Sequence, residues 1–243
     1  MDVYKIIADQ DKVNEFIDWL PRLEENEMFY TSLFARSKYH DSVSADKQQL
    51  KRFTSNKEWL LSKIIQSQSI FGSYCNKNGT AIPQEAIAIY ITPNPRNMEK
   101  AAIATAHKLI DLVSSPYSGY NPHQICLNEI QKTKSKTRFV IFDFDIDKDI
   151  YDPALNIGYD NKLEEINKLI ESIEKIIPEK CMSYIETRGG LHVLVKVDEK
   201  PDTYNKMWYN DFKLIKGLDQ SGDQMIPIVG TYQGGFVPRF IKI

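Results

Sequence analysis

The sequence has few cysteines, no long apolar run and no excess of positive charge. Its three cysteines, Cys75, Cys126 and Cys181, are far apart and form no C-x-x-C pair, which excludes a disulfide framework and a cysteine-based structural zinc site. The longest apolar run, 86–91, is far shorter than the about 20 residues that span a bilayer. The N-terminus lacks the apolar segment of a signal peptide. We therefore expect a cytoplasmic protein with reduced thiols and no membrane partner.

The charge balance excludes a strongly basic protein that coats nucleic acid. Lys and Arg number 31 against 33 for Asp and Glu, and the net charge is -2. Any contact with nucleic acid must therefore come from locally clustered charge. The dense basic run before residue 139 is interpreted either as a solvated linker or as a contact to a template strand. It consists of Lys132, Lys134, Lys136 and Arg138.

We expect two regions in the 243 residues. Residues 1–80 are predicted to be a helix-rich accessory subdomain, because apolar side chains repeat with helical spacing over 13–20 and again over 56–65. A strand or extended turn is expected between them at 28–36. Residues 81–243 are predicted to be the region that carries the chemistry.

A strand, a turn and a helix are predicted at the start of the second region. The strand is expected at 86–92, the turn at 93–96, and an amphipathic helix after it. The loop 114–122 is the expected internal boundary, because it is rich in turn residues. The predicted inner face of the helix consists of Ile103, Ala106, Ile110 and Val113.

The following elements have the order β-α-β-β-α-β. The expected strands are 138–147, 182–187, 191–197 and 225–229; helices are expected at 163–177 and 204–215. The fold class is therefore α+β, with a split β-α-β-β-α-β (ferredoxin-like) core over residues 138–229. In that arrangement the first and third strands are neighbours at the centre of one sheet.

Three acids alternate with apolar residues on the first strand of this core. Asp143, Asp145 and Asp147 share one face, and the apolar residues share the other. Aligned carboxylates repel one another and are disfavoured in strands, unless a cation lies among them. Mg²⁺ or Mn²⁺ suits such oxygen ligands. The alternative is a solvated acidic strand end, which we favour for Asp147 alone.

His192 is expected beside this acidic pair. It follows the Gly189-Gly190 turn, and its ring points away from the apolar face of its strand. Arg188 at the turn and Lys196 further along the strand add positive charge. A third acid is expected where the last strand begins, and Asp219 and Asp223 both remain candidates, with turn formation as the alternative for each.

These motifs resemble those of the archaeo-eukaryotic primase superfamily, particularly its prokaryotic, plasmid and phage primase-polymerases. The resemblance covers about residues 85–238. It implies that Asp143, Asp145 and Asp219 bind two divalent ions, Mg²⁺ or Mn²⁺, and that His192 contacts the phosphates of an incoming nucleotide. The N-P-R stretch ending at Arg96 is similar to one found upstream in some members. Asp147 and Asp223 depart from the pattern, and the zinc-binding cysteines of some relatives are absent.

We therefore expect a template-directed nucleotidyltransferase that makes or extends primers by a two-metal mechanism. The catalytic residues would be Asp143, Asp145, His192 and Asp219, and the partners would be single-stranded DNA and nucleoside triphosphates, with a helicase or another replication protein as a further candidate partner. The positive charges of Arg96, Arg188 and Lys196 would offset the triphosphate. Two alternatives remain: a metal-dependent nuclease, and a non-catalytic single-stranded nucleic-acid-binding module of RRM-like fold.

Overall fold

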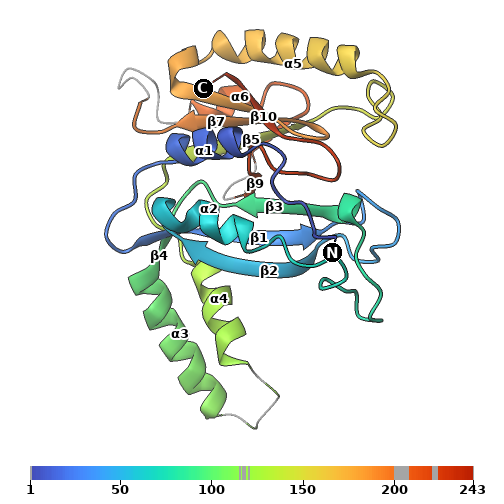
Figure 1. Cartoon of the computed structure of the whole chain (residues 1–243). Helices are drawn as coiled ribbons and strands as arrows, with labels where there is room; N and C mark the ends of the chain where they lie inside the picture. The colour runs from blue at the N-terminus through green and yellow to red at the C-terminus, as the bar shows by residue number, and fades with distance from the viewer. Residues whose placement is uncertain are drawn as a thin grey trace.

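The computed structural model describes residues 2–114, 116, 119, 121–199, 208–220 and 224–242. Two antiparallel sheets lie one above the other, with helices around them and a helical hairpin extending from the lower sheet (Figure 1). The α+β fold class expected from the sequence is confirmed. No helix in the described part of the chain has both the length and the apolar character needed to cross a membrane.

The first sheet has the strand order β2-β1-β3-β9, with the short β4 paired to β1. One face of β1 and β3 packs into the largest apolar cluster together with α1 and α2. Side chains cap both helices: Asp9 accepts from the backbone of α1, and Asn56 from that of α2. The elements are α1 (Gln10–Trp19), β1 (Glu27–Ala35), β2 (Gln48–Ser55), α2 (Lys57–Ile65), a 3₁₀ turn η1 (Gln84–Ala86), β3 (Ile87–Ile91), β4 (Arg96–Asn97) and β9 (Ile226–Pro227).

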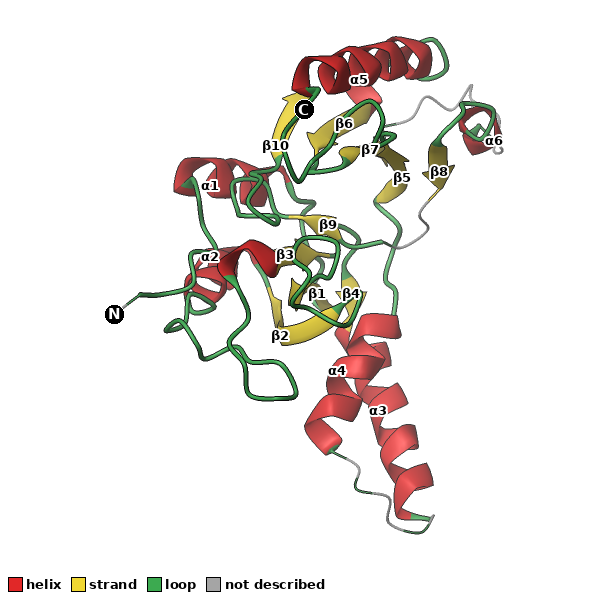
Figure 2. Ribbon diagram, turned by 90° about the vertical axis from the view of Figure 1, so that its right-hand side faces the viewer, coloured by secondary structure: helices red, strands yellow, loops and turns green. Residues whose placement is uncertain are grey.

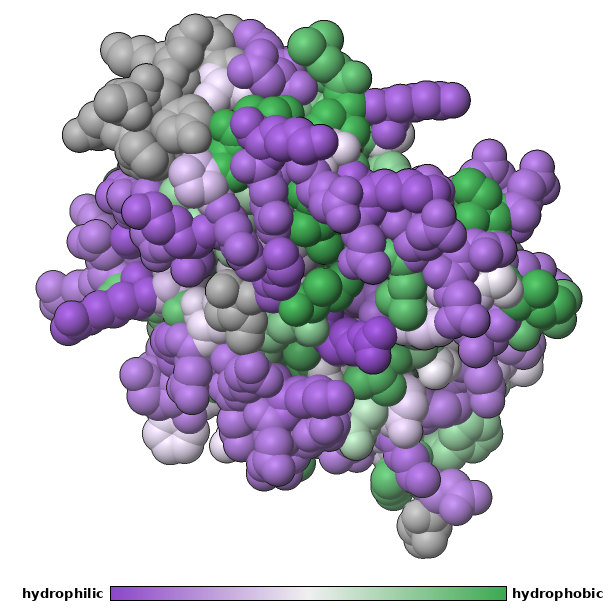
Figure 3. Space-filling view, turned by 90° about the horizontal axis from the view of Figure 1, so that it is seen from above, coloured by the Kyte–Doolittle hydropathy of each residue, from purple (hydrophilic) through white to green (hydrophobic). Residues whose placement is uncertain are grey.

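The second sheet has the strand order β10-β6-β7-β5-β8, and every pair is antiparallel. Its upper face is covered by α5, whose apolar side packs on the strands. The outward surface seen from above is mainly hydrophilic (Figure 3). The elements are β5 (Phe139–Asp145), α5 (Tyr159–Glu174), a 3₁₀ turn η2 (Glu179–Cys181), β6 (Met182–Glu186), β7 (Gly190–Lys196), α6 (Tyr209–Phe212), β8 (Leu218–Gln220) and β10 (Arg239–Lys242).

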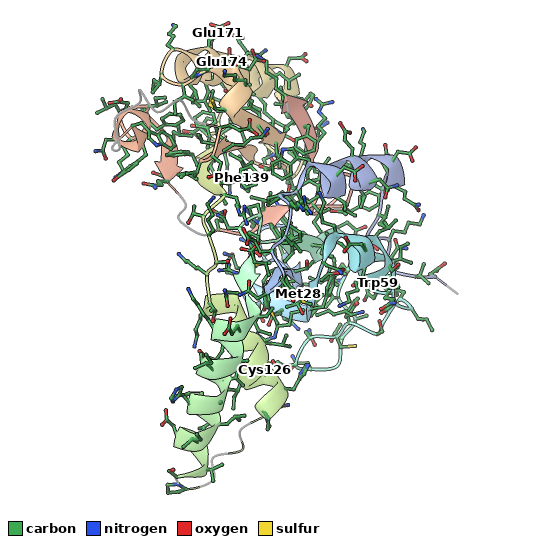
Figure 4. The ribbon with its side chains drawn as sticks, turned by 90° about the vertical axis from the view of Figure 1, so that its left-hand side faces the viewer. Met28, Trp59, Cys126, Phe139, Glu171 and Glu174 are labelled. Atoms are coloured by element: carbon green, nitrogen blue, oxygen red, sulfur yellow. The ribbon has the colours of Figure 1, made fainter. Side chains whose placement is uncertain are left out.

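Helix α1 links the two sheets. The Trp19 ring stacks on Phe139 of β5 at 5.0 Å between centroids, and its Nε1 donates to Ser183 Oγ of β6 at 3.0 Å. Phe16 stacks on Phe240 of β10. Figure 4 shows Phe139 in the upper sheet and Met28 in the lower sheet. Because one apolar cluster includes residues of both sheets, the two sheets share a core.

Helices α3 (Met98–Val113) and α4 (Pro122–Lys132) form the hairpin that extends from the lower sheet (Figure 2). The segment expected as a boundary, 114–122, connects them, and part of it lies outside the described residues. Helix α4 was not predicted, although Asn121 caps it and Pro122 begins it. The predicted inner face of α3 is wrong: Ile103, Ile110 and Val113 are 55 %, 64 % and 72 % exposed.

Two further expectations need correction. The segment 225–229 was expected to complete the core sheet, but β9 pairs with β3 of the first sheet, and β8 is the strand that borders β5. The first sheet also contains strands from both sides of the boundary expected between residues 80 and 81. Residues 1–80 therefore share a sheet with the region after them, and they contribute its two longest strands, β1 and β2.

Candidate functional site

Strand β5 carries the acidic pair in the middle of the second sheet. It pairs with β7 along its whole length, as predicted, and with β8 on its other side. In this register Asp143 lies directly opposite His192 on β7 and directly opposite Asp219 on β8. Directly opposed residues project from the same face, with Cβ atoms about 4.5 to 5.5 Å apart. Three acids, counting Asp145 two residues along the strand, therefore share one face with His192.

The Asp143 carboxylate is held at both oxygens. His192 Nε2 lies 3.1 Å from Asp143 Oδ1, and Gln224 Nε2 lies 3.4 Å from Oδ2. Burial alone would raise the pKa of Asp143, but the hydrogen bond and charge of His192, the bond from Gln224 and the charge of Lys38 outweigh it and lower that pKa. Asp143 is therefore ionised at neutral pH.

His192 is less exposed than the sequence suggested. It was expected on an open face, but the residue is only 5 % exposed. Its Nε2 faces Asp143, while its Nδ1 is buried without a hydrogen-bond partner among the described residues. The imidazole is thus fixed at one end by Asp143 and has an unused polar atom at the other.

Asp145 lies at the end of β5 and reaches solvent. Its strand neighbour is Gly190, so no side chain stands beside it on β7. A Cβ atom at Gly190 would lie 1.8 Å from the Phe144 carbonyl oxygen, so the close approach of the two strands requires glycine there. Partial burial and the charges of Asp143 and Asp219 raise the pKa of Asp145, although Lys38 and His192 act against the rise.

The remaining acids differ in placement. Asp147 lies beyond the end of β5, where its Oδ1 accepts the backbone N–H of Asp149, so the interpretation as a strand-end residue is supported. Asp219 is exposed on β8, and its charge acts on Asp145. Asp223 lies outside the described residues, so the prediction that Asp219 is the nearer of the two stays a prediction.

The donor set suits a hard divalent cation in its chemistry, because it offers carboxylate oxygens on one face of the sheet. Burial is the main cause of the raised pKa of Asp145, and the charges of Asp143 and Asp219 add to it; a bound cation would offset that repulsion. Within the described ranges, no three His, Cys, Asp or Glu side chains are arranged as a formed metal site. Asp143 instead uses its oxygens for His192 and Gln224.

Arg188 connects loops. Its guanidinium donates to the carbonyl oxygens of Lys38 at 3.2 Å and Pro153 at 3.3 Å, and it lies over the Tyr39 ring. The expected phosphate-binding role of Arg188 therefore competes with a role in joining the loop after β1 to the loop before α5.

Two other expected cations lie away from the acidic pair. Lys196 is opposite Phe139, at the other end of β5 from Asp145, and its Nζ is 3.4 Å from Glu199. Arg96 is 2 % exposed in β4 of the first sheet, opposite Met28. The structure brings neither side chain next to the acidic pair. Lys196 shares the face of His192 but lies four residues along the strand, and Arg96 lies in a different sheet.

Lys38 is the cation that the sequence reading missed. It follows β1, and its charge acts on both Asp143 and Asp145. Partial desolvation and then Arg36 lower the pKa of Lys38, while the two aspartates act to raise it. Nothing in its spacing signals this position, since Lys38 reaches the acids from a loop of the other sheet.

The basic run before β5 is largely neutralised by acids. Lys132 pairs with Glu129 at 2.9 Å, and Lys136 pairs with Asp198 at 3.1 Å. Arg138 pairs with buried Glu27 at 3.1 Å. These ion pairs favour the structural interpretation of the run over template contact.

Comparisons of this chain with protein-family models, with curated proteins and with solved structures found no match. The function is therefore inferred from the residues and their geometry.

Proposed function

We propose that this chain is a metal-dependent, template-directed nucleotidyltransferase of the primase-polymerase kind, which synthesises or extends short primers. The observation that supports it best is the register around Asp143. Residues from three separate segments, Asp143, His192 and Asp219, occupy one row of neighbouring strands. They are the residues that the superfamily resemblance selects, in the order of its three motifs.

The sheet order supports the finer fold assignment that belongs to this proposal. Within β10-β6-β7-β5-β8, the two central strands of a split-βαβ core would be β5 and β7, and β6 and β8 would flank them. Helix α5 connects β5 to β6, as such a core requires. In this proposal β8 replaces the segment 225–229 as the last strand, and β10 is an addition at the far edge.

The proposed division of roles follows from the contacts. Asp143, Asp145 and Asp219 would hold Mg²⁺ or Mn²⁺, and the ions would supply activation of the attacking hydroxyl and stabilisation of the leaving pyrophosphate. His192 fixes the Asp143 carboxylate through its 3.1 Å contact, and its buried Nδ1 would have to become accessible to donate to a phosphate oxygen. Lys38 supplies positive charge next to the acids, which assists binding of a polyanionic triphosphate.

The non-catalytic alternative has less support. An RRM-like module stacks bases on aromatic side chains of its two central strands. Here Asp143, Asp145 and His192 occupy the equivalent face of β5 and β7. Carboxylates repel nucleic-acid phosphates, so this face suits metal-assisted chemistry better than base stacking.

The test is incubation of the protein with a labelled single-stranded DNA template, with and without a primer, in the presence of nucleotides and Mg²⁺ or Mn²⁺. Asp143→Asn with Asp145→Asn is the active-site variant, and Asp149→Asn with Asp160→Asn removes the same charge at exposed positions elsewhere. Synthesis by the wild type and the control, but not by the active-site variant, is expected. Degradation of the labelled strand would identify a nuclease, and binding without reaction would identify a non-catalytic module.

A further inference from the structure

The outer face of the first sheet, opposite its apolar core, is polar and aromatic. On this face Ser32 of β1 lies between Arg52 of β2 and Tyr90 of β3. Phe34 lies one step further along β1, opposite Gln49, and meets the Tyr90 ring edge-on at 6.0 Å. Part of this face packs, because Tyr30 lies in an apolar cluster with residues of α3 and α4 and Tyr90 lies in another with Tyr39. Phe34, Gln49 and Arg52 remain at least partly exposed on it.

A cavity of about 470 Å³ opens on this face next to the acidic pair. Phe34 and Tyr90 provide its aromatic surface, and Lys47 provides positive charge. Arg36 also lines it, but its guanidinium pairs with exposed Asp46 at 3.4 Å. Gln224 lines the same cavity and also donates to Asp143 Oδ2. The cavity and the candidate active site are therefore neighbours that share one side chain.

The cavity continues along the sheet. Gln49 also lines a second cavity, of about 270 Å³, between β2 and α4, together with Arg52 and His123. None of the described residues lining the two cavities is acidic. Arg52 donates to neutral oxygens of Gln124 and Asn128, so its charge is not cancelled there. The two cavities share Gln49 in their linings, and we name them together the sheet groove.

Aromatic side chains beside positive charges and amides are the chemistry that binds single-stranded nucleic acid: rings stack on bases, and cations contact the backbone. The basic run at 132–138 lacks this character, because acids pair with most of its charges. We infer that the sheet groove binds the single-stranded template and leads it to the acids of β5, an inference that rests on the proposed function. Phe34 would stack a base, and Lys47 would contact a phosphate.

The experiment measures the anisotropy of a fluorescent oligothymidylate with EDTA present, so that binding is separated from metal-dependent chemistry. Phe34→Ala is expected to weaken binding about tenfold, and Phe34→Trp is expected to restore it. Lys47→Ala should reduce the slope of log affinity against log salt by about 0.7, the value for one phosphate contact to a single strand. The matched control removes two charges from the basic run, as Lys132→Ala with Lys136→Ala, and should bind like the wild type.

Several outcomes would overturn the inference. Unchanged affinity in Phe34→Ala and Lys47→Ala would do so, as would equal losses in the control. A stronger effect of Phe34→Ala on a free nucleoside triphosphate than on the oligonucleotide would assign the groove to the incoming nucleotide instead. Thermal melts of each variant identify any loss that comes from unfolding, and Phe34→Trp keeps the test valid if Phe34→Ala is destabilised. The Asp143→Asn with Asp145→Asn variant should still bind the oligonucleotide, although it should not synthesise a primer. Its binding therefore tests the groove independently of the proposed function.

Discussion

The Asn94 side chain takes the place of a neighbouring strand for Phe139. Its Oδ1 accepts the backbone N–H of Phe139 at 2.9 Å and that of Arg138 at 2.8 Å, and its Nδ2 donates to the Phe139 carbonyl at 2.9 Å. Asn94 belongs to the N-P-R stretch that suggested a phosphate contact. It instead fixes the start of the strand that carries the acids, so this part of the motif has a structural role.

Asn94→Ala is expected to destabilise the protein by about 2 to 4 kcal/mol, because it leaves buried backbone groups at the start of β5 without partners. Urea denaturation measures the loss. Asn167→Ala, at an exposed position of α5, is the control and should change stability by less than about 0.5 kcal/mol. Equal stability of both variants would contradict the strand-like role of Asn94.

The two aspartates should respond oppositely to neutralisation in metal-free protein. The pKa of Asp145 is raised in the folded state, so its ionised form opposes folding, and Asp145→Asn should raise the melting temperature at neutral pH. The pKa of Asp143 is lowered, so Asp143→Asn should lower the melting temperature. The effect of Asp145→Asn should vanish as the pH falls below the ordinary aspartate pKa of about 3.9, whereas that of Asp143→Asn should be lost only as the pH falls through the lowered pKa of folded Asp143. Melts in EDTA across pH test this, and both variants should lose nucleotide transfer.

His192→Ala should weaken nucleotide binding and slow transfer while Mn²⁺ still binds. The proposed partner of the imidazole is a phosphate, whereas all three carboxylates are still present and Asp143 still accepts from Gln224. Nucleotide affinity, Mn²⁺ affinity and the transfer rate, measured separately, distinguish this from loss of the metal. His107→Ala, at an exposed position of α3, is the control. Loss of Mn²⁺ affinity with unchanged nucleotide affinity would make His192 a metal-site residue instead.

Glu27 should make stability depend on pH. Burial would raise its pKa, but hydrogen bonds from Ser135 and the Glu24 backbone, with the charge of Arg138, outweigh burial and lower it. The ionised carboxylate therefore stabilises the folded state above its unfolded pKa of about 4.5, and this contribution disappears as the pH falls through the folded pKa. Glu27→Gln should be less stable than the wild type at pH 7, by a margin that shrinks on acidification. Denaturation at several pH values measures it, and a constant margin would show that the charge is unimportant.

Gly190→Ala should disrupt the site while its neighbour tolerates the same change. A Cβ at Gly190 would collide with the Phe144 backbone, whereas one at Gly189 would approach only the Asp145 side chain, at 3.4 Å. We expect about 1 to 3 kcal/mol of destabilisation for Gly190→Ala and much less for Gly189→Ala. Denaturation of the two variants provides a matched pair, and equal losses would argue against close strand approach as the reason for glycine.

The sequence was sufficient to predict the second sheet near the acids. The alternation of acidic and apolar residues located β5, and the Gly-Gly turn located β6 and β7. Antiparallel pairing of β5 with β7 then placed His192 opposite Asp143. Such neighbours follow from local patterns, because strand period and turn position determine which residues face each other.

Relationships between the sheets were not predictable in the same way. A short apolar segment such as 225–229 shows the same sequence pattern whichever sheet it joins. The prediction therefore placed β9 in the wrong sheet. Lys38 and Gln224 approach the acids from segments packed on the sheet, and no local period encodes that packing. The spacing of Ile103, Ile110 and Val113 predicted a helix correctly, but it could not show which surface would remain uncovered.

The placement of β9 has a consequence for folding during synthesis. The first sheet begins with β1 near the N-terminus, but its last strand, at residues 226–227, leaves the ribosome only after the entire second sheet except β10. Until then β3 has an unpaired edge, and nascent chains with open edges are prone to wrong pairing. The many contacts between distant residues also slow folding. Newly made chains should therefore depend on chaperones until residues 226–227 are released.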